Sequence, residues 1–132
     1  MIPKFRARDE RGNWHVGLLT FMFGQYAIVN EADENSVYLI DKETVGQSTG
    51  LKDKNGVEIF EGDLVEHDDN INGTWETFEA CEIVYDVDYA QFCFKNDASN
   101  FLSYYRNLCI IGNIHENPEL LEKASEEDDS KV

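Results

Sequence analysis

The chain has 132 residues, a length that suits one modest hydrophobic core. Its 27 acidic and 11 basic residues give a net charge of −16, which disfavours direct binding to the phosphate backbone of a nucleic acid. No apolar run approaches the roughly 20 residues of a membrane span, and the N-terminal segment is charged from residue 4. We therefore expect a cytoplasmic protein with one domain over residues 1–124 and an acidic, disordered tail over residues 125–132.

The charge is unevenly distributed along the chain. Residues 61–97 contain 11 acidic side chains and a single lysine, which gives −10 for that stretch. The N-terminal residues are basic instead and contain Lys4, Arg6, Arg8 and Arg11. This asymmetry favours a basic partner or a cation for the acidic part, with simple solubility as the alternative.

The first forty residues have the pattern of short β-strands. Phe5 and Ala7 alternate with basic residues, and the apolar residues that follow the first turn alternate or run continuously, as in strands of a core. Gly24 interrupts the second run. We predict strands over residues 4–8, 14–23, 26–29 and 37–40, a turn over 9–13 and a polar loop over 30–36.

The middle of the chain contains a strong turn signal, Asn55-Gly56. A type I′ hairpin turn needs positive φ at two successive residues, which this dipeptide tolerates best. Residues 81–87 alternate apolar and acidic side chains and predict a half-buried strand with a carboxylate face. We also predict a polar loop over 67–73, strands over 64–65, 91–94 and 108–114, and a short helix over 97–105.

The C-terminal helix has good start signals. Asn117 suits the N-cap, Pro118 suits the first helical position, and a helix over residues 118–124 follows. Many short strands with frequent turns favour a small antiparallel barrel or sandwich. The segments that begin at Asp9 and Asp53 share an aspartate followed three residues later by glycine, a weak internal echo that two hairpins would give by chance.

Three separated blocks carry a resemblance to a known family. They are residues 4–7 (KFRA), residues 49–65 (TGLKD, then G and EGDLV) and residues 111–120 (IGNIHENPEL). Together they resemble the YopX family of small phage and prophage proteins, although Arg8-Asp9 stands where the family usually has Trp-Asp. The resemblance implies a mostly β fold with SH3-like barrel character, a C-terminal helix and a bacterial host, and it implies no activity.

One segment matches the calcium-binding loop of EF-hand proteins. In that loop, oxygen ligands wrap a hard cation and a glycine at the sixth position, here Gly73, makes the sharp turn. Strand-like patterns on both sides favour an ordinary solvated loop as the alternative. The candidate calcium ligands are Asp68, Asn70, Asn72, Thr74, Glu76 and Glu79.

The remaining chemistry-bearing residues suggest no catalytic site. Cys81, Cys93 and Cys109 form no CxxC pair and are expected to be reduced and buried. The three histidines lack zinc-site spacing, and no nucleophile elbow, P-loop or dinucleotide-binding motif is present. Glu82, Asp86 and Asp88 predict one acidic strand face, which is either a partner-binding face or a solvated surface.

Three functional hypotheses follow. The first is a non-enzymatic module that binds an unknown protein partner. The second is an acidic DNA mimic that inhibits a DNA-binding protein, and the third is a protein that binds calcium through residues 68–79. A homo-oligomer is a further hypothesis, since four aromatic residues are candidates for interface anchors or core: Trp14, Trp75, Tyr104 and Tyr105.

Overall fold

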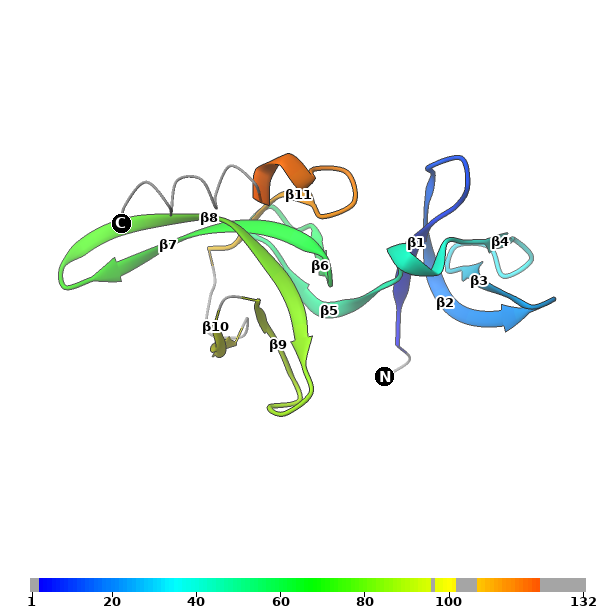
Figure 1. Cartoon of the computed structure of the whole chain (residues 1–132), viewed down its shortest axis with the longest axis horizontal. Helices are drawn as coiled ribbons and strands as arrows, with labels where there is room; N and C mark the ends of the chain where they lie inside the picture. Colours follow the sequence, from blue (N-terminus) through cyan, green and yellow to red (C-terminus); the bar gives the residue numbers. More distant parts are fainter. Residues whose placement is uncertain (1–2, 96, 102–106, 122–132) are drawn as a thin grey trace. The chain divides into compact units, whose positions relative to one another are not determined.

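The computed structural model describes residues 3–95, 97–101 and 107–121. Within them the fold is mainly β: two antiparallel sheets, one curled into a half-barrel, and one short helix over residues 118–121 (Figure 1). The mainly β prediction and the C-terminal helix are confirmed, and an SH3-like barrel stays a prediction. No helix in the described part of the chain is long and apolar enough to cross a membrane.

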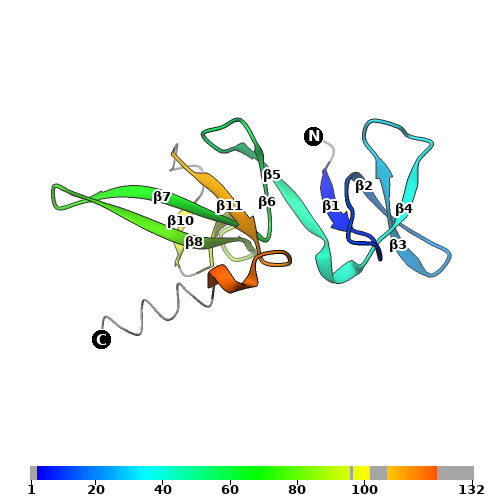
Figure 2. The same ribbon diagram turned by 90° about the horizontal axis from the view of Figure 1, so that it is seen from above.

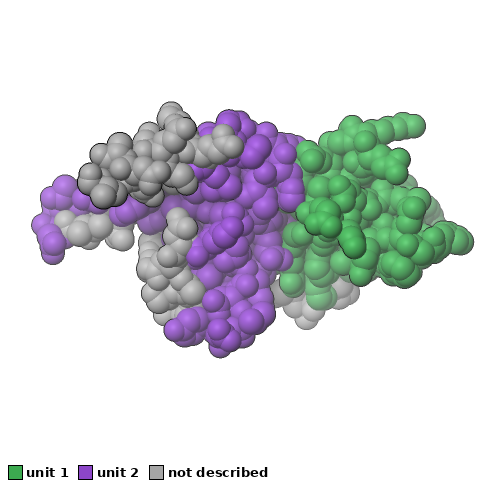
Figure 3. Space-filling view, viewed as in Figure 1, with its two compact units in different colours: residues 1–48 green, residues 49–132 purple. Residues whose placement is uncertain are grey.

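Contacts divide the chain into two compact units, Met1–Ser48 and Thr49–Val132 (Figure 3). The six-stranded sheet has the order β4-β3-β2-β1-β5-β6, and β5 crosses the boundary between the units. The predicted single domain over residues 1–124 stays a prediction. The strands are β1 (Phe5–Arg8), β2 (Trp14–Met22), β3 (Gln25–Asn30), β4 (Val37–Leu39), β5 (Gly46–Lys52) and β6 (Glu58–Phe60), with a 3-10 turn, η1 (Lys42–Thr44).

Unit 1, Met1–Ser48, has its small core on one face of strands β1 to β4. Ala7 and Ile28 are fully buried there. The sheet curls around this core strongly enough for His15 of β2 to stack on Tyr38 of β4, with ring centroids 3.8 Å apart, although β3 lies between the two strands. The core cluster comprises Ala7, Ile28 and Ile40, with Phe5, Leu19 and Val45 packed against it.

Gly17 allows β2 and β3 to approach closely. A Cβ at this position would lie 1.8 Å from the carbonyl oxygen of Val29, a separation that no side chain can have. Because the obstructing atom belongs to the backbone of the paired strand, a substitution would have to move the strand itself.

Unit 2, Thr49–Val132, contains the five-stranded sheet of order β10-β9-β8-β7-β11. Its core joins residues from β6 to β9 with Leu108, which precedes β11: Ile59, Val65, Ile83, Phe94 and Leu108. Figure 2 shows β7 and β8 as a long paired ribbon that ends in a tight turn. The strands are β7 (Asp63–Ile71), β8 (Thr74–Asp86), β9 (Gln91–Phe94), β10 (Asp97–Phe101) and β11 (Cys109–Asn113).

Two local predictions are wrong in the described residues. The polar loop over 67–73 is a strand followed by a two-residue turn, because Asn72 and Gly73 both have positive φ (+53° and +84°) and allow β7 and β8 to pair up to that turn. The helix over 97–105 is strand β10 as far as Phe101, since pairing with β9 outweighs the local capping signals. Residues 102–106 and the predicted tail, 125–132, lie outside the described residues.

The Asn55-Gly56 prediction is correct in position and wrong in turn type. Strands β5 and β6 are neighbours in the sheet on either side of this dipeptide, as predicted. However, only Gly56 has positive φ (+83°), so the connection is not a type I′ turn. The loop is organised instead by Asp53.

Replacing Gly17 with alanine is expected to destabilise the protein by more than about 3 kcal/mol, because the added methyl group must displace the backbone of β3. Urea unfolding followed by circular dichroism measures this. Gly73→Ala is the control: its φ is +84° but the space around it is open, so a loss of only about 1 kcal/mol is expected. Equal losses in the two variants would contradict the described approach of β2 and β3.

Candidate functional site

Two loops, Asp9–Asn13 and Asp53–Val57, share one hydrogen-bond pattern. In each, the aspartate N–H donates to the carbonyl four residues on, and the glycine N–H, from Gly12 or Gly56, donates back to the aspartate carbonyl. In each, the aspartate Oδ1 accepts two backbone amides at 2.9–3.0 Å. The weak sequence echo therefore corresponds to a shared loop structure, and the two loops differ in what the second carboxylate oxygen contacts.

In the loop Asp53–Val57, the second carboxylate oxygen of the aspartate stabilises the fold. Asp53 is 8% exposed, and its Oδ2 accepts the backbone N–H of Ile110 at 3.1 Å, which connects the loop to β11. Burial raises the pKa of Asp53, but the amides of Val57, Ile110 and Asn55 outweigh burial and hold that pKa below its usual value. The Asp53 carboxylate is therefore ionised at neutral pH, and both of its oxygens accept hydrogen bonds from backbone amides.

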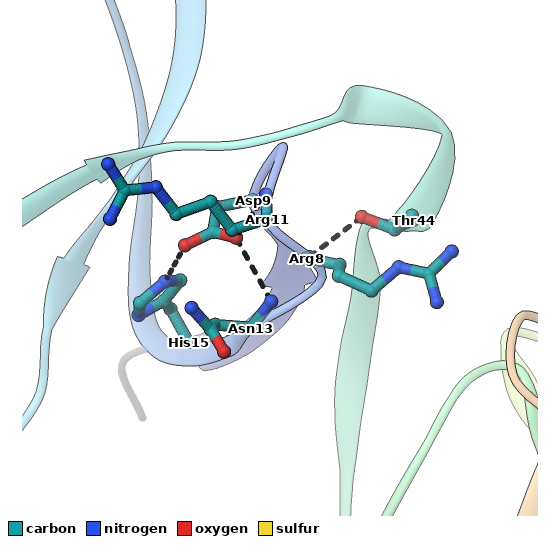
Figure 4. Close-up of polar contacts among 6 residues, drawn as sticks. All are labelled: Arg8, Asp9, Arg11, Asn13, His15 and Thr44. Atoms are coloured by element: carbon teal, nitrogen blue, oxygen red, sulfur yellow. Dashed lines mark hydrogen bonds and ion pairs between the residues drawn. The ribbon is translucent and has the colours of Figure 1, made fainter.

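In the loop Asp9–Asn13, the second carboxylate oxygen of the aspartate positions the side chain of His15. Asp9 Oδ2 lies 2.8 Å from His15 Nε2, as Figure 4 shows. The hydrogen bond from His15, followed by the amide of Asn13, lowers the pKa of Asp9. Since the imidazole also stacks on Tyr38, it is held from two sides.

The held imidazole lines an open groove of about 1100 Å³ at one end of the unit 1 sheet. Arg11 and Asn13 from the loop and Tyr38 to Asp41 from the end of β4 also line it. Among the described lining residues there is no serine, threonine or cysteine to act as a nucleophile. The Asp9–His15 pair therefore provides a rigid corner of the sheet and lacks the partner that nucleophilic catalysis requires.

The face of β1 to β4 opposite the core contains apolar side chains that are exposed on β2 and β4 and half-buried at Val29 of β3. Residues directly opposite one another on paired strands share a face, so Leu18, Val29 and Val37 form one row across three strands. Leu18, Val37 and Leu39 are 47%, 41% and 48% exposed. We define the outer face as Arg6, Arg8, Trp14, Val16, Leu18, Val29, Val37 and Leu39.

Two arginines lie at one side of the outer face. The Arg6 and Arg8 guanidinium carbons lie 5.0 and 5.6 Å from the centroid of the Trp14 ring, within the range of a cation–π contact. The backbone N–H of Arg8 donates to Thr44 Oγ1 at 2.8 Å, which holds the end of β1 against η1 (Figure 4). In the sequence the basic stretch and Trp14 are separate features. The alternation of Arg6 and Arg8 with Phe5 and Ala7 is the signal that places the arginines on one face, and the register adds Trp14 to it.

A smaller apolar cluster lies at the β2–β3 turn. Phe23 is 94% exposed and has positive φ (+53°), and Phe21 and Tyr26 form an edge-to-face pair with centroids 5.1 Å apart. This cluster is confined to one hairpin end, whereas the outer face extends over four strands.

The predicted acidic face is divided among different roles. Glu82 is an ion-pair partner of Lys95, with 3.7 Å between Oε1 and Nζ, and its side chain is 12% exposed. Asp86 Oδ1 accepts the amides of Asp88 and Tyr89 and closes the turn after β8. Asp88 follows β8 and is exposed. A partner-binding face made of Glu82, Asp86 and Asp88 stays a prediction.

The predicted calcium ligands lie on paired strands and their tight turn. Asp68 is opposite Thr77, and its Oδ1 accepts a hydrogen bond of 2.6 Å from the Thr77 hydroxyl group. Asn70 is opposite Trp75. Two paired strands do not wrap a cation as a loop between helices does. In the described part of the chain no group of three or more His, Cys, Asp or Glu residues is arranged to hold a metal ion. Calcium binding stays a prediction for all six candidate ligands: Asp68, Asn70, Asn72, Thr74, Glu76 and Glu79.

The three cysteines and two of the four candidate interface aromatics lie within the described residues. All three cysteines are free thiols, but only Cys93 is buried as predicted, because Cys81 and Cys109 are half-buried. Desolvation raises the pKa of Cys81 to about 11, so that thiol is not ionised at neutral pH. Trp75 is 69% exposed on β8, and Trp14 belongs to the outer face. Tyr104 and Tyr105 fall outside the described residues.

Comparison with known proteins identifies the family. The sequence profile of the YopX protein matches residues 4–122. The chain belongs to the YopX family. It is also similar to the crystal structure of protein EF1440 from Enterococcus faecalis, with 32% identity, a TM-score of 0.55, and coverage of 92% of this chain and 99% of that one. No curated protein matches the chain significantly.

The blocks of sequence that resemble the YopX family have structural roles here. Asp63 is 2% exposed and its Oδ2 accepts the Phe60 amide at 2.8 Å. Asn113 Oδ1 accepts the amides of the two residues that follow Ile114, and a Cβ at Gly112 would lie 2.5 Å from Asn117 Oδ1. Asn117 directly precedes the helix and its carbonyl accepts the Leu120 amide, as the predicted N-cap position requires, while its Oδ1 accepts the Asn113 amide. These YopX residues build turns, which leaves the outer face as the candidate functional surface.

Asp53→Asn is expected to reduce the free energy of unfolding by about 2–4 kcal/mol at pH 7, because an amide nitrogen would face the Ile110 N–H. A carboxyl group with a lowered folded pKa stabilises the protein above its unfolded pKa, near 3.8, and loses that contribution as pH falls through the folded pKa. The difference from the unsubstituted protein should therefore be largest above about pH 5 and shrink below pH 3.8.

Urea titrations at several pH values measure this difference. Asp88→Asn is the matched control, since Asp88 is exposed, and its stability should follow that of the unsubstituted protein. A difference for Asp53→Asn that does not change with pH would contradict the assigned role of its charge.

Proposed function

We propose that this YopX-family chain is a non-enzymatic protein-interaction module, that it acts in the cytoplasm of a bacterial host, and that its outer face is the binding surface. The observation that carries the proposal is the exposed row of aliphatic side chains across β2, β3 and β4, with Leu18, Val37 and Leu39 each more than 40% exposed. A contiguous apolar patch of this kind, with polar groups at its border, is typical of a protein-binding surface.

Two further observations support this proposal over the alternatives. The groove beside His15 has no described nucleophile, and the shifted carboxyl pKa values have structural causes, which favours binding over catalysis. Within the acidic stretch over residues 61–97, Glu82 forms an ion pair and Asp86 closes a turn, so part of its charge already has a structural role. The concentration of acidic residues in unit 2, 20 against 6 basic, is consistent with solubility.

Affinity purification of the tagged chain from cells that naturally carry its gene tests the proposal. Leu18→Ser and Leu39→Ser on the outer face should each reduce recovery of one stoichiometric partner roughly tenfold, since each removes a buried apolar contact. Val87→Ser is the matched control, because Val87 is 80% exposed and lies outside this face.

Thermal unfolding must show that all three variants remain folded. Equal recovery of the partner by the outer-face variants and the control would contradict the proposal. So would specific turnover by the purified chain in a broad hydrolase and nuclease screen.

A further inference from the structure

We infer that the outer face binds a protein segment in which acidic side chains lie beside apolar ones. This inference rests on the proposed function and adds the chemistry of the partner. It starts from Arg6 and Arg8, which lie on the same face of β1 and flank Trp14 at 5.0 and 5.6 Å.

The outer face differs in charge from the rest of the chain. Although the chain has 27 acidic residues, the outward positions of β1 to β4 include two arginines and no carboxylate. Unit 1 has 5 basic and 7 acidic residues, a net charge of −2, whereas unit 2 has −14. The two arginines therefore favour an acidic partner segment at the outer face, whereas unit 2, with −14, repels such a segment more strongly than unit 1 does.

The arrangement of the arginines suits carboxylates. Alternate residues on a strand lie about 7 Å apart, so Arg6 and Arg8 present two guanidinium groups at a spacing that two carboxylates of one segment can match. Guanidinium groups bind carboxylates through paired hydrogen bonds, and both groups lie within cation–π distance of the Trp14 ring, which keeps them beside the apolar side chains.

The extent of the outer face suits one segment of secondary structure. Four strands at a spacing of about 4.8 Å make a face roughly 14 Å wide, and an α-helix with side chains is about 10–12 Å across. A single amphipathic helix can place its apolar residues on Leu18, Val37 and Leu39 and its acidic residues on the two arginines.

A nucleic acid fits the same surface less well. Single-stranded nucleic acids bind platforms on which several bases stack, and Trp14 is the single aromatic residue of the eight that make up the outer face. The net charge of −16 also repels a polyanion within a Debye length of about 10 Å at 0.1 M salt. The aliphatic majority of the face favours a protein.

Selection from a random helical-peptide display library on the immobilised full-length chain tests the inference. Enriched peptides should combine Asp or Glu with Leu, Phe or Trp at helical spacing. Synthetic copies should bind Arg6→Gln/Arg8→Gln roughly tenfold more weakly than the unsubstituted chain, because two charge-assisted contacts are lost. Lys52→Gln/Lys54→Gln removes the same charge from exposed positions of unit 2 and should leave the affinity unchanged.

Each contrary result has a separate meaning. If Leu18→Ser removes binding but the peptides lack acidic residues and tolerate Arg6→Gln/Arg8→Gln, the inference fails and the proposed function stands. If no outer-face substitution changes binding, the proposed function fails as well. If fluorescein-labelled oligo(dT) binds more tightly than the selected peptides, the inference fails in favour of a nucleic acid. If light scattering shows self-association that Leu39→Ser removes, it fails in favour of a second copy of the chain.

Discussion

The hydrogen bonding of aspartate carboxylates to backbone amides is the interaction on which both units depend. A β fold of short strands leaves many loop amides that water or a local acceptor must satisfy. In the loops at Asp9 and Asp53, one carboxylate oxygen accepts two of these amides, and the other oxygen reaches a different element. Through these second contacts, Asp53 joins its loop to β11, and Asp9 joins its loop to His15 and so to Tyr38 on β4.

These contacts change how the chemistry-bearing residues should be interpreted. Aspartate, histidine and cysteine are the usual candidates for catalysis, but here Asp53, Asp63 and Asp86 accept hydrogen bonds from backbone amides. The half-buried Cys81 has a pKa raised by desolvation. The curled sheet leaves its other, aliphatic face exposed. We therefore propose the outer face as the functional surface and interpret these aspartates as residues that stabilise turns.

The sequence predicted most strands of unit 1 because alternation of apolar and polar residues there reflects one buried face. It could not separate two copies of the same dipeptide: Asn72-Gly73 forms the tight two-residue turn, whereas at Asn55-Gly56 the carboxylate of Asp53 organises a longer loop. The helix predicted from Asp97 is a strand because pairing with β9 is a long-range contact that capping rules do not include. The outer face was missed because Leu18 and Val37 are typical core residues, and only the register shows that they lie opposite the core.

The central claim is that the outer face contacts a protein partner in the cell. Site-specific incorporation of a photo-crosslinking amino acid at Leu18 or Leu39, with Val87 as the reference position, measures this contact directly in cells that naturally carry the gene. We expect one discrete crosslinked species of the same mass from Leu18 and from Leu39, and none from Val87. Absence of a crosslink at both outer-face positions, or the same species from all three, would contradict it.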